Sequence, residues 1–266
     1  MIDSHCHLGS SQFSPEEIPA LIANAKSHGV TRMITLATGE DDLERNLRLA
    51  KDHAEISACL GIHPCDVHQT SDDFELLLSP HLDDPVVAAI GETGLDYFHP
   101  APEGWTEDGY HRRQRHFLRR HFSLAAKHGL NIVIHTRDRT GTASFDDALK
   151  IFREFHKHVR AVFHCFPGSI AEAQQVISLG GLVSFTGIVT FKNAQKVAET
   201  ATLCPAGSFI VETDSPYLSP VPHRGERCQP AFTKFTGEKI AALRNMDIEE
   251  LSTETDATCS SFFRLL

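Results

Sequence analysis

The sequence predicts an α/β protein, a single-domain (β/α)8 TIM barrel that spans residues 1–266. Short apolar, β-branched runs alternate with longer segments of helical period, and the chain is close to the ~250 residues of one such barrel. Eight strand candidates are present, as this fold requires. They are Met1–Ser4, Thr31–Ala37, Ile56–Gly61, Val86–Gly91, Asn131–Ile134, Arg160–Phe163, Leu182–Thr186 and Ser208–Val211.

Amphipathic segments of helical period lie between these strands. Three of them stop at a glycine two residues before the next predicted strand, which is a signal of a helix C-terminus. The segments are Pro15–Gly29, Leu43–His53, Arg113–Gly129, Ser144–His158 and Ile170–Gly180, followed by Ala231–Leu243 and Ile248–Leu266. Phe98–Tyr110, rich in proline, glycine and acidic residues, is expected to be an exposed loop after the fourth strand.

An open, doubly wound sheet could also be built from eight such strands. That fold would normally place a glycine-rich phosphate loop after an early strand, and the sequence has none. The closed barrel is therefore favoured, and no linker or internal repeat divides the chain.

Composition excludes several classes of protein. The sequence shows no signal-peptide pattern and no apolar run of membrane-spanning length, so we expect a cytoplasmic protein without membrane contact. Seven scattered cysteines without C-x-x-C spacing argue against a disulfide framework or a zinc knuckle. The formal charge of −10 argues against a broad basic surface that binds nucleic acid. A polyanionic substrate would have to be bound at the site itself, by metal ions and a few arginines.

Residues that bind metals follow the ends of the predicted strands. Catalytic groups of this fold lie at the carboxyl ends of its strands, so residues at these positions would face one mouth. His5 and His7 form an H-x-H pair after the first strand, and residues two apart in a strand point the same way. The others at this end are His63 after the third strand, Glu92 after the fourth, His135 after the fifth, His164 after the sixth and Asp214 after the eighth.

The residue types indicate different roles. Glu92 suits a bridge between two ions, because each carboxylate oxygen can bind one. A single histidine such as His135 or His164 is often a satisfied core residue, but two on neighbouring strands favour a second ion. Asp214 can ligate the first ion and accept a proton from an attacking water, whereas Glu212 is a rival carboxylate deeper in the strand.

His63 and Arg224 are poorer ligand candidates than the residues above. An imidazole and a guanidinium both donate hydrogen bonds to phosphate, so a role in binding a substrate anion suits them better. The alternative for Arg224 is a solvated charge on a loop.

In these residues and in the motifs around them, the sequence resembles the TatD family of metal-dependent deoxyribonucleases, a branch of the amidohydrolase-like barrels. The matching motifs are short, but they follow the family order from residue 2 to about residue 230. They are Ile2–Leu8, Gly61–Pro64, Gly91–Tyr97, Ile134–Asp138, His164–Phe166, Thr190–Ala194 and Glu212–Leu218.

The resemblance implies hydrolysis of DNA phosphodiester bonds, with exonuclease action on DNA that is single-stranded or has accessible ends, and no obligate protein partner. It also implies two divalent ions, Mg, Mn or Zn. One ion would be held by His5, His7, Glu92 and Asp214, and the other by Glu92, His135 and His164. Asp214 and Glu92 would be the catalytic residues, with His63 and Arg224 near the scissile phosphate.

The sequence departs from the family pattern mainly in loops. Cys228 stands where many relatives carry asparagine, Pro167 replaces a small polar residue, and the loop Phe98–Tyr110 is longer than usual. The ending Thr255–Leu266 matches only loosely. None of these departures touches an expected ligand, so they bear on the choice of substrate rather than on activity.

Two other functions remain open. The same ions could polarise a carbonyl in a deacylase or amidohydrolase that acts on an ester or amide such as an aminoacyl-tRNA. Such enzymes often use a carboxylated lysine as the bridge, and no lysine stands at the relevant strand ends. A barrel that has lost catalysis would serve as a binding or scaffold protein, and a missing ligand would be its sign.

Overall fold

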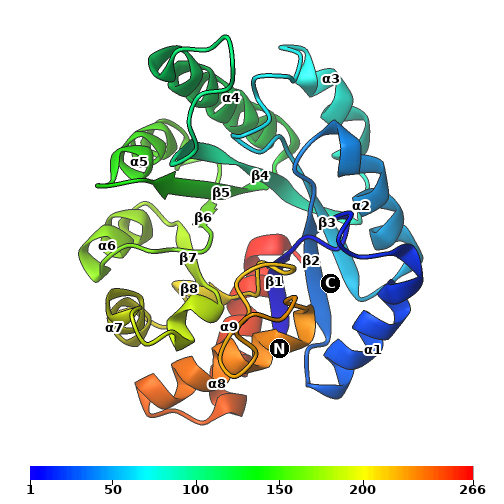
Figure 1. The fold of residues 1–266 in the computed structure, drawn as a ribbon, viewed down its shortest axis with the longest axis vertical. Helices are drawn as coiled ribbons and strands as arrows, with labels where there is room; N and C mark the ends of the chain where they lie inside the picture. The colour runs from blue at the N-terminus through cyan, green and yellow to red at the C-terminus, as the bar shows by residue number, and fades with distance from the viewer. Residues whose placement is uncertain (266) are drawn as a thin grey trace.

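Eight parallel strands form a ring in the computed structural model, which describes residues 1–265 (Figure 1). They pair in chain order, and the segment that follows the eighth strand meets the first strand through a parallel bridge between Cys6 and Ser215, so the barrel is nearly closed. The expected (β/α)8 fold is confirmed. The strands are β1 (Ile2–Cys6), β2 (Arg32–Leu36), β3 (Ile56–Leu60), β4 (Val87–Tyr97), β5 (Asn131–Asp138), β6 (Ala161–Phe163), β7 (Leu182–Phe185) and β8 (Phe209–Val211).

The helices surround this ring (Figure 1). They are α1 (Ile18–Ser27), α2 (Glu40–Asp52), α3 (Phe74–Leu78), α4 (Glu107–His128), α5 (Ala143–Phe155), α6 (Ile170–Ser178), α7 (Gln195–Leu203), α8 (Thr233–Arg244) and α9 (Ile248–Phe263). Short 3-10 helices cover Pro15–Glu17, Ser79–His81, Gly187–Thr190 and Pro230–Phe232. Within residues 1–265, none of these helices is both long enough and apolar enough to cross a membrane.

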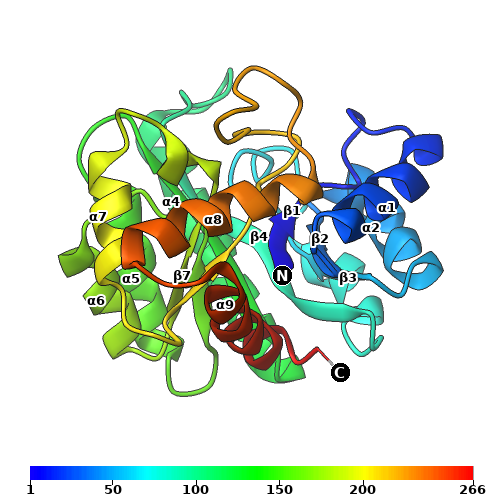
Figure 2. The same ribbon diagram turned by 90° about the horizontal axis from the view of Figure 1, so that it is seen from below.

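The inside of the barrel is filled by apolar side chains of alternate strand positions, and α9 covers the end from which the strands start (Figure 2). Phe262 and Phe263 of α9 belong to the same buried cluster as Ile34 and Val133. The Asn131 side chain at the start of β5 donates to the carbonyl oxygen of Phe262 across 2.6 Å. With this end filled, the carboxyl ends of the strands form the open mouth of the barrel.

Three strands run further than the sequence predicted. His5, Glu92 and His135 were expected after their strands, and this placement is wrong because they lie within β1, β4 and β5. Beyond a register shift between Ile90 and Thr93, β4 and β5 continue to pair as a two-stranded extension past the mouth. The extension contains polar residues on both strands, so an apolar pattern could not predict it.

The expected loop Phe98–Tyr110 is shorter than predicted, because α4 begins at Glu107. Thr106 caps this helix by accepting a hydrogen bond from the backbone N–H of Gly109 at 3.1 Å. Tyr110 is buried rather than exposed, and its hydroxyl donates to the carbonyl of Pro64 at 3.1 Å. The short helices α3 and α7 were not expected, and Leu266 of the last expected helical segment lies outside the described residues.

Candidate metal centre

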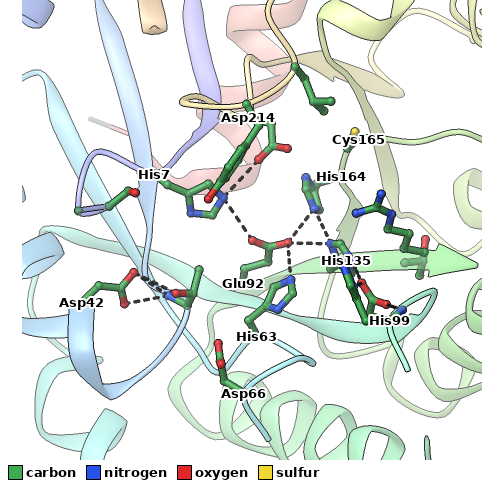
Figure 3. Close-up of a pocket in the computed structure, with 18 of the residues that line it drawn as sticks. His7, Asp42, His63, Asp66, Glu92, His99, His135, His164, Cys165 and Asp214 are labelled. Atoms are coloured by element: carbon green, nitrogen blue, oxygen red, sulfur yellow. Dashed lines mark hydrogen bonds and ion pairs between the residues drawn. The ribbon is translucent and has the colours of Figure 1, made fainter. Parts of the chain in front are cut away.

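A cavity of about 1090 Å³ opens at the carboxyl ends of the strands (Figure 3). Its floor is the row of histidines and carboxylates that the sequence indicated as ligands. Five of these six residues line the cavity: His7, Glu92, His135, His164 and Asp214. His5 lies at the floor with its side chain fully buried, in contact with Glu92 and Asp214.

One group of ligand atoms comes from β1, β4 and the segment after β8. The Nε2 atoms of His5 and His7 are 3.2 Å apart, and the Oδ1 atom of Asp214 lies 3.7 Å from the first and 3.2 Å from the second. The Oε2 atom of Glu92 completes the group, at 3.4 Å from His5 and 3.5 Å from His7. Each of the two carboxylate oxygens thus lies within 3.7 Å of both histidine nitrogens.

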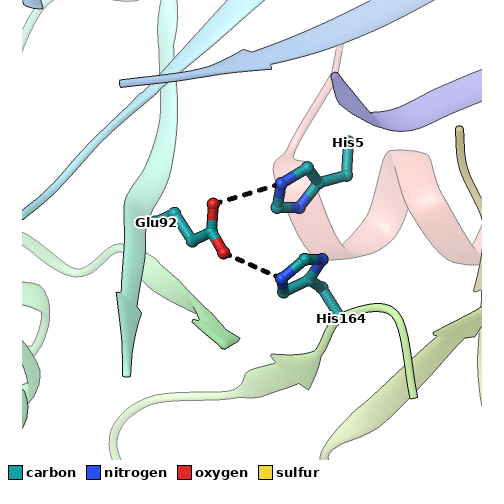
Figure 4. Close-up of side chains that lie close together, drawn as sticks. All are labelled: His5, Glu92 and His164. Carbon is teal, nitrogen blue, oxygen red and sulfur yellow. Dashed lines mark ion pairs between the residues drawn. The ribbon is translucent and has the colours of Figure 1, made fainter. Parts of the chain in front are cut away.

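A second group uses the other oxygen of the same carboxylate. The Oε1 atom of Glu92 lies 2.8 Å from Nε2 of His164 and 3.0 Å from Nδ1 of His135. These two nitrogens are 3.3 Å apart. Figure 4 shows Glu92 between His5 and His164, with one oxygen turned to each. Glu92 is therefore shared by the two groups, one through each oxygen.

The spacing of these atoms fits divalent ions. Metal–ligand distances of about 2.0–2.1 Å place neighbouring ligand atoms of a tetrahedral or octahedral ion roughly 3.0–3.4 Å apart. The His5–His7 and His135–His164 nitrogen pairs, at 3.2 and 3.3 Å, have this separation. One proton can join only two of the several nitrogens and oxygens that converge in each group. A cation satisfies all of them at once.

Two of the histidines have an acceptor for the ring nitrogen that faces away from the cluster, and a third has a carboxylate nearby. Nδ1 of His7 lies 3.2 Å from the carbonyl oxygen of Leu36, and Nε2 of His135 lies 3.2 Å from Oδ2 of Asp96. Nδ1 of His164 lies 3.5 Å from Oε1 of Glu212, within ion-pair distance but without a hydrogen bond. Such acceptors fix the ring and leave the lone pair of the other nitrogen free for an ion.

No role was predicted for Asp96, and Glu212 was expected to be a carboxylate that competes with Asp214. In the structure each of these carboxylates lies beside the ring nitrogen of a histidine that faces away from the ion groups. Because side chains in a strand alternate, Asp96 shares a face with Glu92 four residues earlier, and this spacing was the available signal. Glu212 also accepts the backbone N–H of Cys165 at 2.7 Å, which orients it away from the ion groups.

Asp3, in the same motif as His5 and His7, helps to position Asp214 by binding the preceding residue, Thr213. Its two carboxylate oxygens accept the backbone N–H and the hydroxyl of Thr213 at 2.9 and 2.7 Å. Complete burial raises the pKa of Asp3 to about 8, although the bonds from Thr213 act in the opposite direction. The pair joins β1 to the chain that leaves β8, so Asp214 is held beside His5 and His7.

Charges at the centre are strongly coupled. Burial acts to raise the pKa of Glu92, but the charge of His164 and the hydrogen bonds from His135 and His164 outweigh it and hold the pKa well below its usual value. Burial acts to lower the pKa of His7, but Asp214 and Glu92 outweigh it and raise the pKa to about 9. Protons therefore occupy sites that a divalent ion would take, and binding of an ion releases them.

His63 faces the second group but differs from its histidines. Its Nδ1 accepts the backbone N–H of Cys65 at 3.2 Å, so the proton of the neutral ring sits on Nε2. That nitrogen lies 3.7 Å from Oε1 of Glu92. Burial lowers the pKa of His63 to about 3, so the ring stays neutral. A neutral ring with its proton turned to the cavity is a hydrogen-bond donor, although His63, Glu92 and His135 also place ligand atoms within 4.8 Å of one another.

Arg224 is placed apart from these residues. Its guanidinium stacks over the ring of Phe191 at 3.8 Å, on an exposed loop after β8, and it is not part of the cavity lining. The structure therefore brings His63 to the ion groups but does not bring Arg224 to them.

Comparison with known proteins assigns this arrangement to a family. The sequence profile described as "TatD related DNase" matches residues 2–264. The chain belongs to the TatD family. The uncharacterized metal-dependent hydrolase YabD of Bacillus subtilis is 32% identical over 100% of this chain and 99% of its own. The metal-dependent hydrolase YcfH of Escherichia coli K12 is 31% identical over 100% of this chain and 96% of its own.

Solved structures of TatD proteins share the fold. The crystal structure of YJJV, a TatD homolog from Escherichia coli K12, superposes with a TM-score of 0.89 at 26% identity and covers 100% of this chain and 98% of that chain. A TatD family hydrolase from Entamoeba histolytica has a TM-score of 0.83 at 18% identity, with the same coverage. The chain is thus a metal-dependent hydrolase of the TatD family.

Proposed function

We propose that this TatD protein is a deoxyribonuclease that hydrolyses phosphodiester bonds with two divalent ions, Mg, Mn or Zn. The observation that carries the proposal is the position of Glu92, whose two oxygens belong to two separate ligand groups. Two ions held by these residues would suit the hydrolysis of a phosphodiester bond. When bound, the ions supply Lewis acidity and positive charge beside the scissile phosphate.

The side chains have distinct tasks in this proposal. Asp214 accepts the proton of the attacking water, because its side chain is 15% exposed to the cavity whereas that of Glu92 is only 3% exposed. His63 donates its Nε2 proton to a phosphate oxygen. Arg224 contacts the substrate backbone further from the centre.

The charges of the cavity make binding of DNA dependent on cations. Seven carboxylates but only two guanidiniums, those of Arg45 and Arg137, line it. Arg45 also donates to the carbonyl of Phe13, and Arg137 stacks over Phe98 at 4.0 Å. A phosphate would be repelled by this lining unless divalent ions compensate the carboxylates.

We further propose that the substrate is single-stranded DNA or a DNA end and that hydrolysis proceeds from an end. The ligand groups lie at the cavity floor, with His5 fully buried. A flexible strand can carry a phosphate to this depth more readily than the stiff backbone of a continuous duplex. All seven cysteines are free thiols, which suits the reducing cytoplasm as the place of action.

The rival reaction, hydrolysis of a carboxyl ester or amide, is tested with one preparation. Metal-stripped protein restored with Mn²⁺ is given end-labelled DNA and an aryl carboxyl ester in parallel. We expect cleavage of the DNA and little turnover of the ester, with Glu92→Gln inactive and Glu199→Gln, an exposed control on α7, unchanged. Turnover of the ester without cleavage of DNA would replace the nuclease with a deacylase.

A further inference from the structure

Beyond the cluster around Glu92, a second kind of ligand cluster lies on the wall of the same cavity. It consists of Cys65, after β3, Asp96, near the end of β4, and His99, just past β4. One ligand atom from each lies within 4.8 Å of the other two. Asp96 and His99 line the cavity, and Figure 3 shows His99 beyond His135 as seen from Glu92.

We propose that Cys65, Asp96 and His99 bind a third metal ion, a thiolate-preferring divalent cation such as Zn²⁺ or Co²⁺. The proposal goes beyond the nuclease function and does not depend on the substrate. A sulfur, a nitrogen and an oxygen are a ligand set that zinc and cobalt accept and that magnesium does not.

The distances fit a tetrahedral ion. With metal–sulfur and metal–nitrogen distances of about 2.3 and 2.0–2.1 Å, a sulfur and a nitrogen ligand lie roughly 3.6 Å apart and a nitrogen and an oxygen roughly 3.3 Å apart. Sγ of Cys65 lies 3.7 Å from Nδ1 of His99, and that nitrogen lies 3.0 Å from Oδ2 of Asp96. Three protein ligands leave the fourth position open, as in zinc centres that bind an exogenous ligand.

The surrounding chain holds each ligand in place. Oδ1 of Asp96 accepts the backbone N–H groups of Phe98 and His99 at 2.9 and 2.8 Å, which closes a tight turn at the end of β4. The hydroxyl of Tyr110 lies 3.0 Å from the carbonyl oxygen of Cys65 and donates to it. Asp96 is almost completely buried, whereas the side chain of His99 is 49% exposed and gives an ion access from solvent.

The thiol is not suited to act without an ion. Burial and the nearby Asp96 and Asp66 carboxylates raise the pKa of Cys65 to about 12. A nucleophilic cysteine needs the opposite shift, whereas at a metal site the cation displaces the thiol proton, which is released to solvent. An ion here would add positive charge to an acidic wall, next to the Asp96 carboxylate that orients His135.

The absorption spectrum of bound Co²⁺ distinguishes this site from the cluster around Glu92, whose ligands contain no sulfur. Metal-stripped protein, reduced and kept free of oxygen, is titrated with Co²⁺ while near-ultraviolet absorption and bound cobalt are measured. We expect a sulfur-to-cobalt charge-transfer band that rises with one equivalent, in addition to the cobalt held around Glu92. Cys65→Ser removes the band and that equivalent, whereas Cys165→Ser keeps both.

The control Cys165 lines the cavity, and its Sγ lies 3.6 Å from the hydroxyl of Thr186. His99→Gln, which keeps the thiol, is expected to weaken the same equivalent at least about 10-fold. Retention of the remaining cobalt shows that each variant is folded. The proposal is overturned if the native chain shows no band, if Cys65→Ser keeps it, or if His99→Gln leaves the affinity unchanged.

Discussion

Glu212 places its Oε1 atom 3.5 Å from Nδ1 of His164, on the side of the ring opposite Glu92. Both side chains are almost completely buried, so the negative charge of the carboxylate raises the basicity of the imidazole. Glu212 thereby acts on the second ion group without joining it.

Glu212→Gln is expected to weaken binding of one divalent ion by about 10- to 100-fold, because the amide keeps the shape of the carboxylate but removes its charge. The other ion, held by His5, His7 and Asp214, should keep its affinity. Isothermal titration of metal-stripped protein with Mn²⁺ measures both, with Glu199→Gln as the control. Equal weakening of both ions would instead indicate a general loss of structure.

Metal-stripped protein is expected to lose stability as pH rises from about 6.5 to about 9. The folded protein binds the proton of His7 more tightly than the unfolded chain, whose pKa is near 6.5, because the folded pKa is about 9. This contribution is complete below pH 6.5 and disappears as pH rises through 9.

A bound ion takes the place of that proton, so the gain in melting temperature on adding Mn²⁺ should widen over the same range. Thermal unfolding with and without Mn²⁺ at several pH values measures this gain. His7→Gln should remove the contribution of His7 to the pH dependence of the metal-stripped protein. A metal-stripped native protein whose stability rises between pH 6.5 and 9 would contradict the charge assignment.

His63→Ala is expected to lower kcat/KM for DNA by about 10²- to 10³-fold, the usual effect of losing one donor to a transition-state oxyanion. Affinity for both ions around Glu92 should stay the same, since Nε2 of His63 carries a proton. Steady-state kinetics and metal titration on the same preparation distinguish the two effects. Loss of one ion would make His63 a ligand.

Arg224→Ala is expected to raise KM for DNA and to leave kcat nearly unchanged, because the guanidinium lies outside the cavity lining. If Arg224 meets a backbone phosphate, the slope of log affinity against log salt concentration should fall by about 1. Binding of labelled DNA at several salt concentrations gives this slope. An unchanged slope would leave Arg224 as a loop charge stacked on Phe191.

Much of the fold was predictable because a parallel barrel leaves a strong local signal. Strands buried on both faces are continuous apolar runs, and their carboxyl ends meet at one mouth, so His5, Glu92 and Asp214 could be grouped although they are far apart in sequence. The short helices α3 and α7 left no such signal. Neither did the extension of β4 and β5, which depends on a register shift rather than on composition.

The contacts around the ligand residues could not be predicted from the sequence. Asp96 contacts His135 because β4 pairs with β5. Glu212 lies beside His164 because of the orientation of the two side chains. Cys65 meets Asp96 and His99 only because the segment after β3 folds against the end of β4. These contacts join residues whose local sequence does not indicate a partner.

The most direct test of a two-ion nuclease centred on Glu92 is the hydrolysis of end-labelled single-stranded DNA. Chelator-stripped protein is assayed alone and with Mg²⁺ or Mn²⁺ restored, beside Asp214→Asn. We expect shortening of the DNA only with metal and only by the native chain, in a ladder that reveals the direction of digestion. Intact DNA in every metal, from protein shown to bind two ions, would contradict the nuclease and leave a hydrolase of esters or amides.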